Sequence, residues 1–147
     1  MSSSNFGNYK PGIGSVGQYQ MSGIPFTTSS VHVDGDLKGT TSQGPTEIEF
    51  PRITKFVTVI NDGSGSNRPL RVGFSALGVS GSDAAAQNNY FVLNNGESFT
   101  GEWRVGSVYL YNHDRALYAT ASVIAGLTGI QTSNMDTIPT WSGSNGV

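Results

Sequence analysis

Short runs of alternating apolar and polar residues dominate the middle of this chain. In residues 70–76, every second side chain from Leu70 to Ala76 is apolar, as expected for a strand with one buried face. Residues 53–60 are the run richest in β-branched and aromatic side chains, which favour strands. The 3.6-residue apolar period of a helix is absent, and residues 84–86 predict at most one helical turn. The predicted strands are 29–33, 46–50, 53–60, 70–76, 90–93, 98–103, 105–111 and 116–124.

Turn-forming residues separate these runs at the spacing typical of β-sandwiches. Residues 94–97 contain Asn95-Gly96 and predict a hairpin with a type I′ turn between the strands on either side. We therefore expect an all-β, antiparallel, eight-stranded sandwich of the jelly-roll kind. A seven-stranded immunoglobulin-like sandwich is the nearest alternative, although the chain lacks the cysteines of true immunoglobulin domains.

The two ends of the chain differ from the middle. We expect an extended N-terminal arm over residues 1–28, a jelly-roll sandwich over 29–127 and a C-terminal arm over 128–147. Both arms are rich in small polar residues, yet large apolar side chains recur along them, which a flexible linker does not need. The alternative is a disordered tail. The arm residues expected at an interface with a partner are Phe6, Tyr9, Tyr19, Ile24, Phe26 and Trp141.

Composition changes this picture in one respect, because charge is scarce. Charged residues make up 12% of the 147-residue chain, the net charge is −2, and glycine contributes 20 residues. A surface with few charges is suited to being covered by neighbouring subunits, although a soluble domain rich in Ser, Thr and Asn is the plainer interpretation. The chain has no cysteine, which excludes disulfides and thiolate zinc sites. We expect neither a secretory signal nor a membrane span.

The residues that carry chemistry form no recognisable catalytic pattern. Residues 12–17 match G-x-G-x-x-G, but Pro11 and the lack of a preceding strand argue against dinucleotide binding. His32 and His113 lie on separate elements, and a cupin-type metal site needs several histidines and a carboxylate. His113 adjoins Asp114, without a nucleophile motif. We therefore predict no catalytic residue, no metal and no cofactor, and a protein that is not an enzyme.

Three further groups of residues bear on possible partners. Glu47 and Glu49 lie on one strand face, which is typical of a solvated or lattice-facing edge rather than of a glycosidase pair. The eight Lys and Arg residues are scattered, so we expect no nucleic-acid partner. An aromatic stripe of Tyr109, Tyr111 and Tyr118 has three interpretations: contact with a partner, a place in the core, or sugar binding.

Three segments give the chain a resemblance to a known group of proteins. Residues 17–29 (GQYQMSGIPFTTS), 50–60 (FPRITKFVTVI) and 123–130 (VIAGLTGI) resemble small structural proteins of large icosahedral DNA viruses, particularly those that infect algae. The likeness covers about half of the chain. It implies a single jelly-roll capsid protein, either a penton or a minor capsid protein. It transfers no functional residue, because such proteins act through surfaces.

We therefore expect a virion structural protein, located in the capsid and assembled in the host cell. Its expected partners are other capsid proteins and copies of itself in a ring, which the resemblance implies to be a pentamer if the protein is a penton. The first alternative is a carbohydrate-binding or host-attachment module, which would bind a glycan through the tyrosines. The second is an enzyme of cupin or glycosidase type, which would need an internal cluster of carboxylates or histidines.

Overall fold

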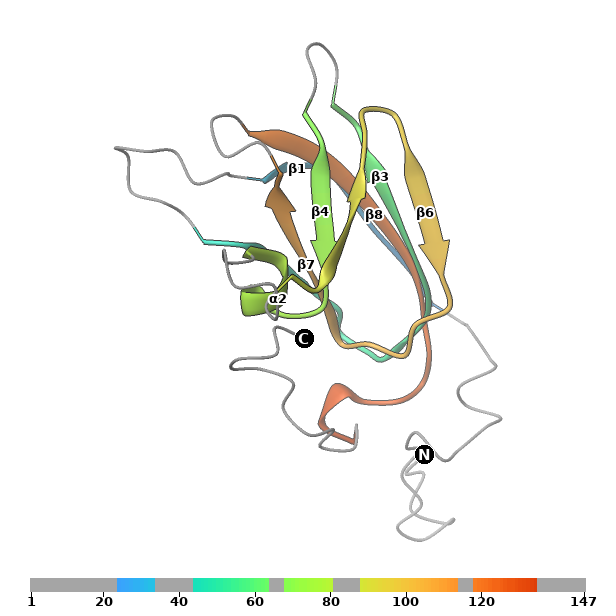
Figure 1. Ribbon diagram of the computed structural model, residues 1–147. Helices are drawn as coiled ribbons and strands as arrows, with labels where there is room; N and C mark the ends of the chain where they lie inside the picture. The colour runs from blue at the N-terminus through green and yellow to red at the C-terminus, as the bar shows by residue number, and fades with distance from the viewer. Residues whose placement is uncertain (1–23, 34–43, 64–67, 81–87, 114–117, 135–147) are drawn as a thin grey trace, which may run out of the picture.

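The computed structural model describes residues 24–33, 44–63, 68–80, 88–113 and 118–134, which form a β-sandwich (Figure 1). Two short helices, α2 (Ala76–Ser80) and the 3-10 helix η3 (Thr132–Asn134), accompany the strands. The predicted all-β class is therefore confirmed. The strands are β1 (Ile24–Val33), β2 (Thr46–Glu49), β3 (Thr54–Asn61), β4 (Leu70–Gly73), β5 (Tyr90–Leu93), β6 (Ser98–Gly101), β7 (Ser107–Asn112) and β8 (Ala119–Leu127).

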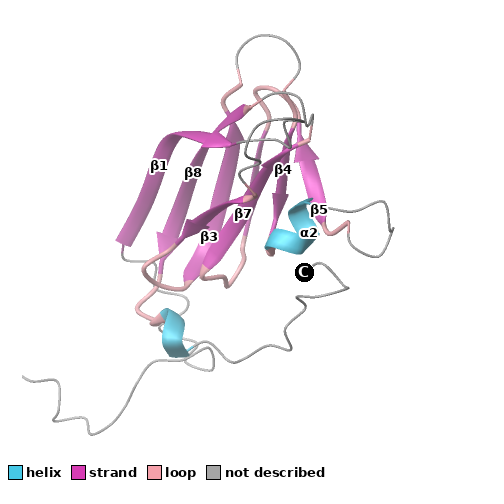
Figure 2. Ribbon diagram, turned by 90° about the vertical axis from the view of Figure 1, so that its left-hand side faces the viewer, coloured by secondary structure: helices cyan, strands magenta, loops and turns pink. Residues whose placement is uncertain are grey.

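The eight strands divide into two four-stranded antiparallel sheets (Figure 2). Sheet A has the order β1-β8-β3-β6, and sheet B has the order β2-β7-β4-β5. Only β4 and β5 follow each other in the chain and also pair in a sheet, so every other connection between consecutive strands crosses from one sheet to the other. The fold is therefore held together by contacts between residues far apart in the sequence.

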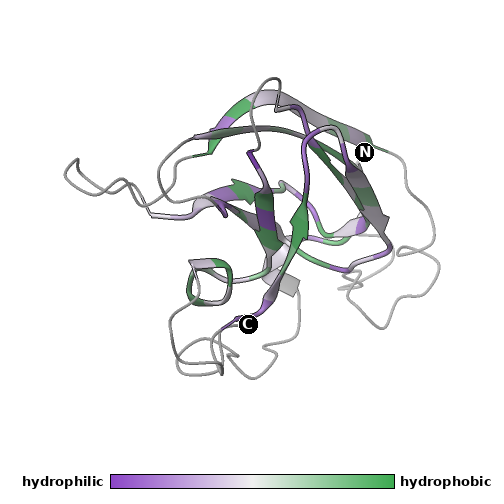
Figure 3. Cartoon of the chain, turned by 45° about the horizontal axis from the view of Figure 1, so that its top comes forward, coloured by the Kyte–Doolittle hydropathy of each residue, from purple (hydrophilic) through white to green (hydrophobic). Residues whose placement is uncertain are grey.

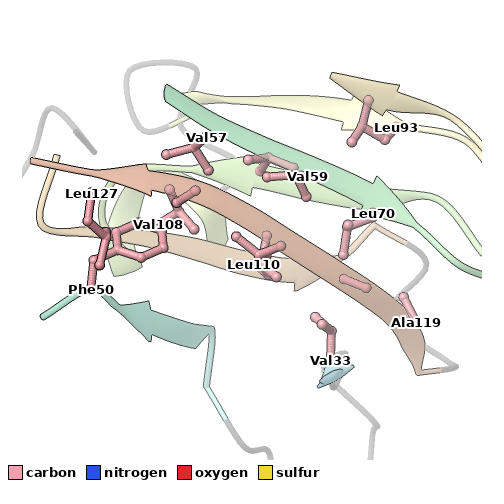
Figure 4. Packing of buried hydrophobic residues seen from close by; sticks show 14 residues of the cluster. Val33, Phe50, Val57, Val59, Leu70, Leu93, Val108, Leu110, Ala119 and Leu127 are labelled. Carbon is pink, nitrogen blue, oxygen red and sulfur yellow. The ribbon is translucent and has the colours of Figure 1, made fainter. Parts of the chain in front are cut away.

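Period-2 alternation places the core between the sheets. Figure 3 shows hydrophobic and hydrophilic colours alternating along the strands. On β8, Ala121 and Val123 face inward and are fully buried, whereas Ile124 points outward. Figure 4 shows inward-facing side chains of β3, β4, β7 and β8 meeting between the two sheets. The largest buried apolar residues of this core include Val57, Val59, Leu70, Val72, Val108, Leu110, Val123 and Leu127.

Strand β1 begins at Ile24, five residues before the predicted start at Ser29. Its first part pairs with β8, with Ile24 opposite Leu127 and Thr28 opposite Val123. Pro25 argued against a strand here in the sequence, because proline cannot donate a ladder hydrogen bond. An edge strand tolerates proline when the missing N–H would have faced outward. Residues 24–28, assigned to the N-terminal arm by sequence, therefore belong to the sandwich.

The chain leaves strand β4 earlier than the alternating pattern of residues 70–76 predicts, because Ser75 starts helix α2. The Ser75 hydroxyl accepts the Gly78 N–H at 3.0 Å, and its carbonyl accepts the Val79 N–H at 3.1 Å. These are the bonds of an N-cap serine. The helical turn predicted at residues 84–86 lies outside the described residues.

The prediction of a hairpin at residues 94–97 is wrong. The strands on either side of this turn lie in different sheets, β5 in sheet B and β6 in sheet A. Gly96 has a φ of 78°, but Asn95 does not have a positive φ, so the turn is not type I′. The Glu97 N–H donates to the Asn94 carbonyl at 2.9 Å, as in a type II turn with glycine at its third position.

Candidate interaction surface

The structure places some of the predicted interface residues and leaves others out. Phe6, Tyr9, Tyr19 and Trp141 lie outside the described residues. Within β1, Ile24 is 54% exposed. Phe26 is half-buried, and its ring packs edge-on against Phe50 with the centroids 5.2 Å apart. Ile24 is therefore available to a partner, whereas Phe26 also fixes β1 to the segment after β2.

The three tyrosines do not form one exposed stripe. Tyr109 and Tyr111 belong to β7 of sheet B, whereas Tyr118 precedes β8 of sheet A. Tyr111 is buried, with the Arg71 guanidinium 5.9 Å from its ring centroid. Tyr118 is 44% exposed, but His32 stacks on its ring at 4.6 Å and Arg68 lies 4.4 Å from the ring centroid. Two neighbours therefore already occupy the ring that was expected to receive a sugar or a partner.

The surroundings of Tyr109, on β7, shift the pKa of its phenol upward. Burial raises the pKa of Tyr109 above 10.0, and its hydrogen bond with Glu47 raises it further. The two residues lie opposite each other in the β2–β7 pair. Glu47 therefore has a structural contact across the sheet, and the neutral phenol is the form that the folded state favours.

A Tyr109→Phe variant is expected to make the protein's stability less sensitive to alkaline pH. Once the pH passes 10.0, the unfolded chain loses the Tyr109 proton while the folded state still holds it. The free energy of unfolding then falls as pH rises, and phenylalanine removes this part of the fall. Urea unfolding of both proteins at neutral pH and just above pH 10.0 measures the effect. Equal losses in the two proteins would contradict it.

Among the described residues, the histidines and carboxylates that the sequence singled out are not brought together. The described residues contain no group of three or more His, Asp or Glu side chains able to hold a metal ion. His113 accepts a hydrogen bond from Arg71 Nε at its Nδ1, 3.1 Å away, and its ring contacts Tyr90. It thus helps to hold the outer face of sheet B. The G-x-G-x-x-G segment at 12–17 and Asp114 lie outside the described residues. Within the described ranges, no helix is long and apolar enough to cross a membrane.

One side of the sandwich is bounded by β1 and β2, and both edge strands carry features that discourage further pairing. Strand β1 contains Pro25 and an irregularity in register between Thr28 and Val31, where Ser30 has a φ of 56°. Strand β2 exposes Glu47 and Glu49 on its outer face. Proline, bulges and charged side chains are the usual protections of a free sheet edge.

The opposite side, bounded by β5 and β6, lacks these protections. Neither strand contains a proline or a charged residue, and both pair in continuous register with their inner neighbours. Ser98, Phe99 and Thr100 of β6 are all exposed, and Val92 of β5 is 36% exposed. No other described strand pairs with the far edge of β6. We call this the open side of the sandwich.

Four aromatic rings line the open side, and we call Phe74, Phe91, Phe99 and Trp103 the aromatic cluster. Phe99 stacks on Trp103 at 5.6 Å and contacts Phe91 at 5.2 Å, while Phe74 meets Trp103 edge-on at 4.9 Å. Phe99 nevertheless remains 47% exposed. Large apolar rings that are held in place yet still accessible are typical anchors of protein interfaces.

Gly101 is what allows the indole to lie against β6. A Cβ atom at this position would overlap Cε2 and Cζ2 of the Trp103 ring. The sequence pattern did not reveal the aromatic cluster, because Phe99 alternates with Ser98 and Thr100 like an ordinary core position and Phe91 belongs to the continuous apolar run of residues 90–93. The available signal was the pattern of Phe99, Gly101 and Trp103, in which a glycine separates two large rings.

The outer face of sheet A adds a second surface with very little charge. Among the strand residues of this sheet, Lys55 alone carries a charge. One row crosses all four strands as Thr27, Ile124, Thr58 and Thr100, and the last two share a hydrogen bond of 2.7 Å. The outer face of sheet B differs, because helix α2 packs against β4 and β7. The Arg71 guanidinium donates there to the carbonyls of Val79 and Ser80.

Comparison with known proteins adds no identification. The sequence matches no protein-family model, and the search of curated proteins finds no match. The features that bear on function are therefore the open side and the outer face of sheet A.

Proposed function

We propose that this protein is a structural subunit of a virion, a capsid component that works by assembling with copies of itself and with other capsid proteins. The observation that carries the proposal is the open side, where an unprotected sheet edge adjoins the partly exposed aromatic cluster. Monomeric β proteins usually block such edges. An edge left open beside interface-type aromatic residues favours a chain that completes its surface with another subunit.

We infer further that the sandwich is a jelly roll. A jelly roll has eight strands in total, divided between two antiparallel sheets and arranged as two Greek keys. The order β1-β8-β3-β6 facing β2-β7-β4-β5, with all but one connection crossing between sheets, supports this inference. An immunoglobulin-like sandwich has seven strands, with several consecutive strands paired in one sheet. Viral capsid proteins are one of the groups that use jelly rolls, which agrees with the resemblance found in the sequence.

Deletion of residues 1–23 is expected to convert an assembling protein into a monomer. The deletion stops at Gly23 because residues from Ile24 onward pair with β8, so a cut at residue 28 would damage the sandwich itself. Native mass spectrometry and light scattering of the intact and shortened chains measure the result. A full-length control with Phe6, Tyr9 and Tyr19 changed to serine keeps the length of the segment but removes its aromatic side chains.

The outcomes of this experiment separate clearly. A loss of assembly in both the shortened chain and the serine control supports an N-terminal segment whose aromatic side chains contact neighbouring subunits. An intact chain that stays monomeric at every accessible concentration, alone and with other virion proteins, would contradict the proposed function. A shortened chain that assembles like the intact one would remove residues 1–23 from the assembly contacts.

Glycan binding is the second candidate function, and one observation favours it. The Phe99 ring is stacked on Trp103 on one side and is still 47% exposed, and flat aromatic rings with a free face can pack against sugars. Glycan-array binding that a Phe99→Ser variant abolishes, with the protein remaining monomeric, would favour this function over assembly. Tyr118 is a weaker platform because His32 and Arg68 contact its ring.

A further inference from the structure

The free edge of β6 presents backbone groups as well as side chains. In an antiparallel pair, alternate residues direct their N–H and C=O groups toward the partner strand. Asn61 N–H donates to the Glu97 carbonyl, and the register then makes Val59 and Phe99 the next hydrogen-bonded pair. The N–H and C=O groups of Ser98 and Thr100 consequently face away from β3. They form an edge that can accept another strand.

The side chains around this edge define what the added strand must carry. Phe99 lies opposite the buried Val59, so it projects on the inner face of sheet A toward the aromatic cluster. Ser98 and Thr100 project on the outer face, which has very little charge. A fitting strand therefore has large apolar residues on one face, small or amide side chains on the other, and no charge.

Residues 18–22 of this chain have that pattern. Tyr19 and Met21 alternate with Gln18, Gln20 and Ser22, glycines flank the run, and the nearest prolines are Pro11 and Pro25. Five residues are too few to predict a strand from sequence alone, but they are enough to pair along the whole of the four-residue β6. Lys10 is the only charged side chain in residues 1–23, so the match extends to charge.

Chain geometry determines which copy can supply this segment. Residue 22 lies only two residues before Ile24, the first residue of β1, and two residues span at most about 7 Å. Strands β1 and β6 are the two opposite edges of sheet A. A strand added beyond β6 is four strand spacings from β1, about 19 Å. A chain therefore cannot place residues 18–22 along its own β6.

We propose that the edge of β6 binds residues 18–22 of a second copy of this chain, which add a fifth strand to sheet A and pack Tyr19 and Met21 against Phe99 and Trp103. The inference rests on the proposed assembly function and names its contact. Each copy gives its segment from the β1 edge and receives one at the β6 edge. The contact is consequently head-to-tail, and such contacts build a ring when the rotation between subunits closes.

A Thr100→Pro variant is expected to lose this contact while its matched control, Thr100→Val, keeps it. Proline removes the outward N–H of residue 100 and does not break a bond to β3. Valine removes the Thr58–Thr100 side-chain hydrogen bond but leaves the N–H in place. We expect the association constant of the proline variant to fall by at least about tenfold, and that of the valine variant to stay unchanged. Native mass spectrometry gives the association state, and thermal unfolding shows that each variant is folded.

Cysteine cross-linking gives an independent measurement, because the chain has no cysteine of its own. A Gln20→Cys chain is mixed with a Thr100→Cys chain under mild oxidation, since both side chains lie on the outer face in the proposed pairing. We expect a disulfide-linked dimer from this mixture. A mixture of Gln20→Cys with Glu47→Cys, on the protected edge of β2, is the control and is expected to give none.

These outcomes distinguish the inference from the function on which it rests. Assembly of the unmodified chain and of both Thr100 variants, without the cross-link, would overturn the β6 contact and leave the assembly function standing. A monomeric unmodified chain would overturn both. If the proline variant does not fold, the cysteine pair decides: a selective Gln20–Thr100 cross-link supports the contact, and its absence refutes it.

Discussion

An Asn61→Ala variant is expected to lose about 3 kcal/mol of unfolding free energy. Asn61 is fully buried at the end of β3. Its side-chain amide donates to the carbonyls of Arg68 and Leu93 at 2.9 Å each, and its Oδ1 accepts the Gly63 N–H at 2.9 Å. Alanine would leave these backbone groups without their partner, and each unsatisfied buried group costs about 1–3 kcal/mol.

Two further variants show whether the loss arises from these hydrogen bonds. Asn61→Asp keeps an acceptor for the Gly63 N–H but lacks the amide donor, so it should be destabilised as well. An alanine at the exposed Asn88 should change stability by less than about 0.5 kcal/mol. Urea unfolding at one pH compares the three. A similar, small effect at both asparagines would show that the Asn61 amide is not what holds the chain at Arg68 and at Leu93 in place.

Asn61 also explains why part of the fold escaped prediction. The β-branched and aromatic side chains of residues 53–60 were enough to predict strand β3, because such residues favour strands wherever they cluster. The pairing of strands leaves no such local signature. The backbone of Asn61 accepts the Gly96 N–H, and Asn95 Oδ1 accepts the Arg68 N–H, so the turn that resembled a hairpin is tied to the loop after β3. Contacts between residues this far apart in the sequence decide which sheet each strand joins.

The candidate surface shows the same limit. Ile24 was expected to contact a partner; its side chain is exposed, and the contact itself stays a prediction. The alternation of Tyr111 with core residues left a partner contact, the core and sugar binding open, and the structure shows the ring buried, with the Arg71 guanidinium 5.9 Å from its centroid. Phe99 has an ordinary core position in the alternating pattern, and it is exposed because β6 is an edge strand. Exposure at an edge depends on the order of strands, which the local pattern does not contain.

A Gly101→Ala variant is expected to destabilise the protein by about 2–3 kcal/mol. The new methyl group would overlap the Trp103 indole, so the ring must leave β6 and lose its stacking on Phe99 and its contact with Phe74. Gly44, which has open space around its Cβ position, is the matched control and should tolerate alanine. Unfolding free energies measure the cost. In a Trp141→Phe background, the fluorescence of Trp103 reports whether the indole becomes more exposed to water.

The decisive comparison is the same substitution made without the indole. In a Trp103→Ala background nothing remains for the methyl group to overlap among the neighbours nearest Gly101. Alanine is intrinsically better than glycine within a strand by about 0.5–1 kcal/mol. Gly101→Ala should therefore change sign and become slightly stabilising there. A double-mutant cycle with a coupling energy of about 2 kcal/mol or more would follow. Simple additivity of the two substitutions would mean that Gly101 is not what seats Trp103 against the open edge, and that the aromatic cluster is held there by other contacts.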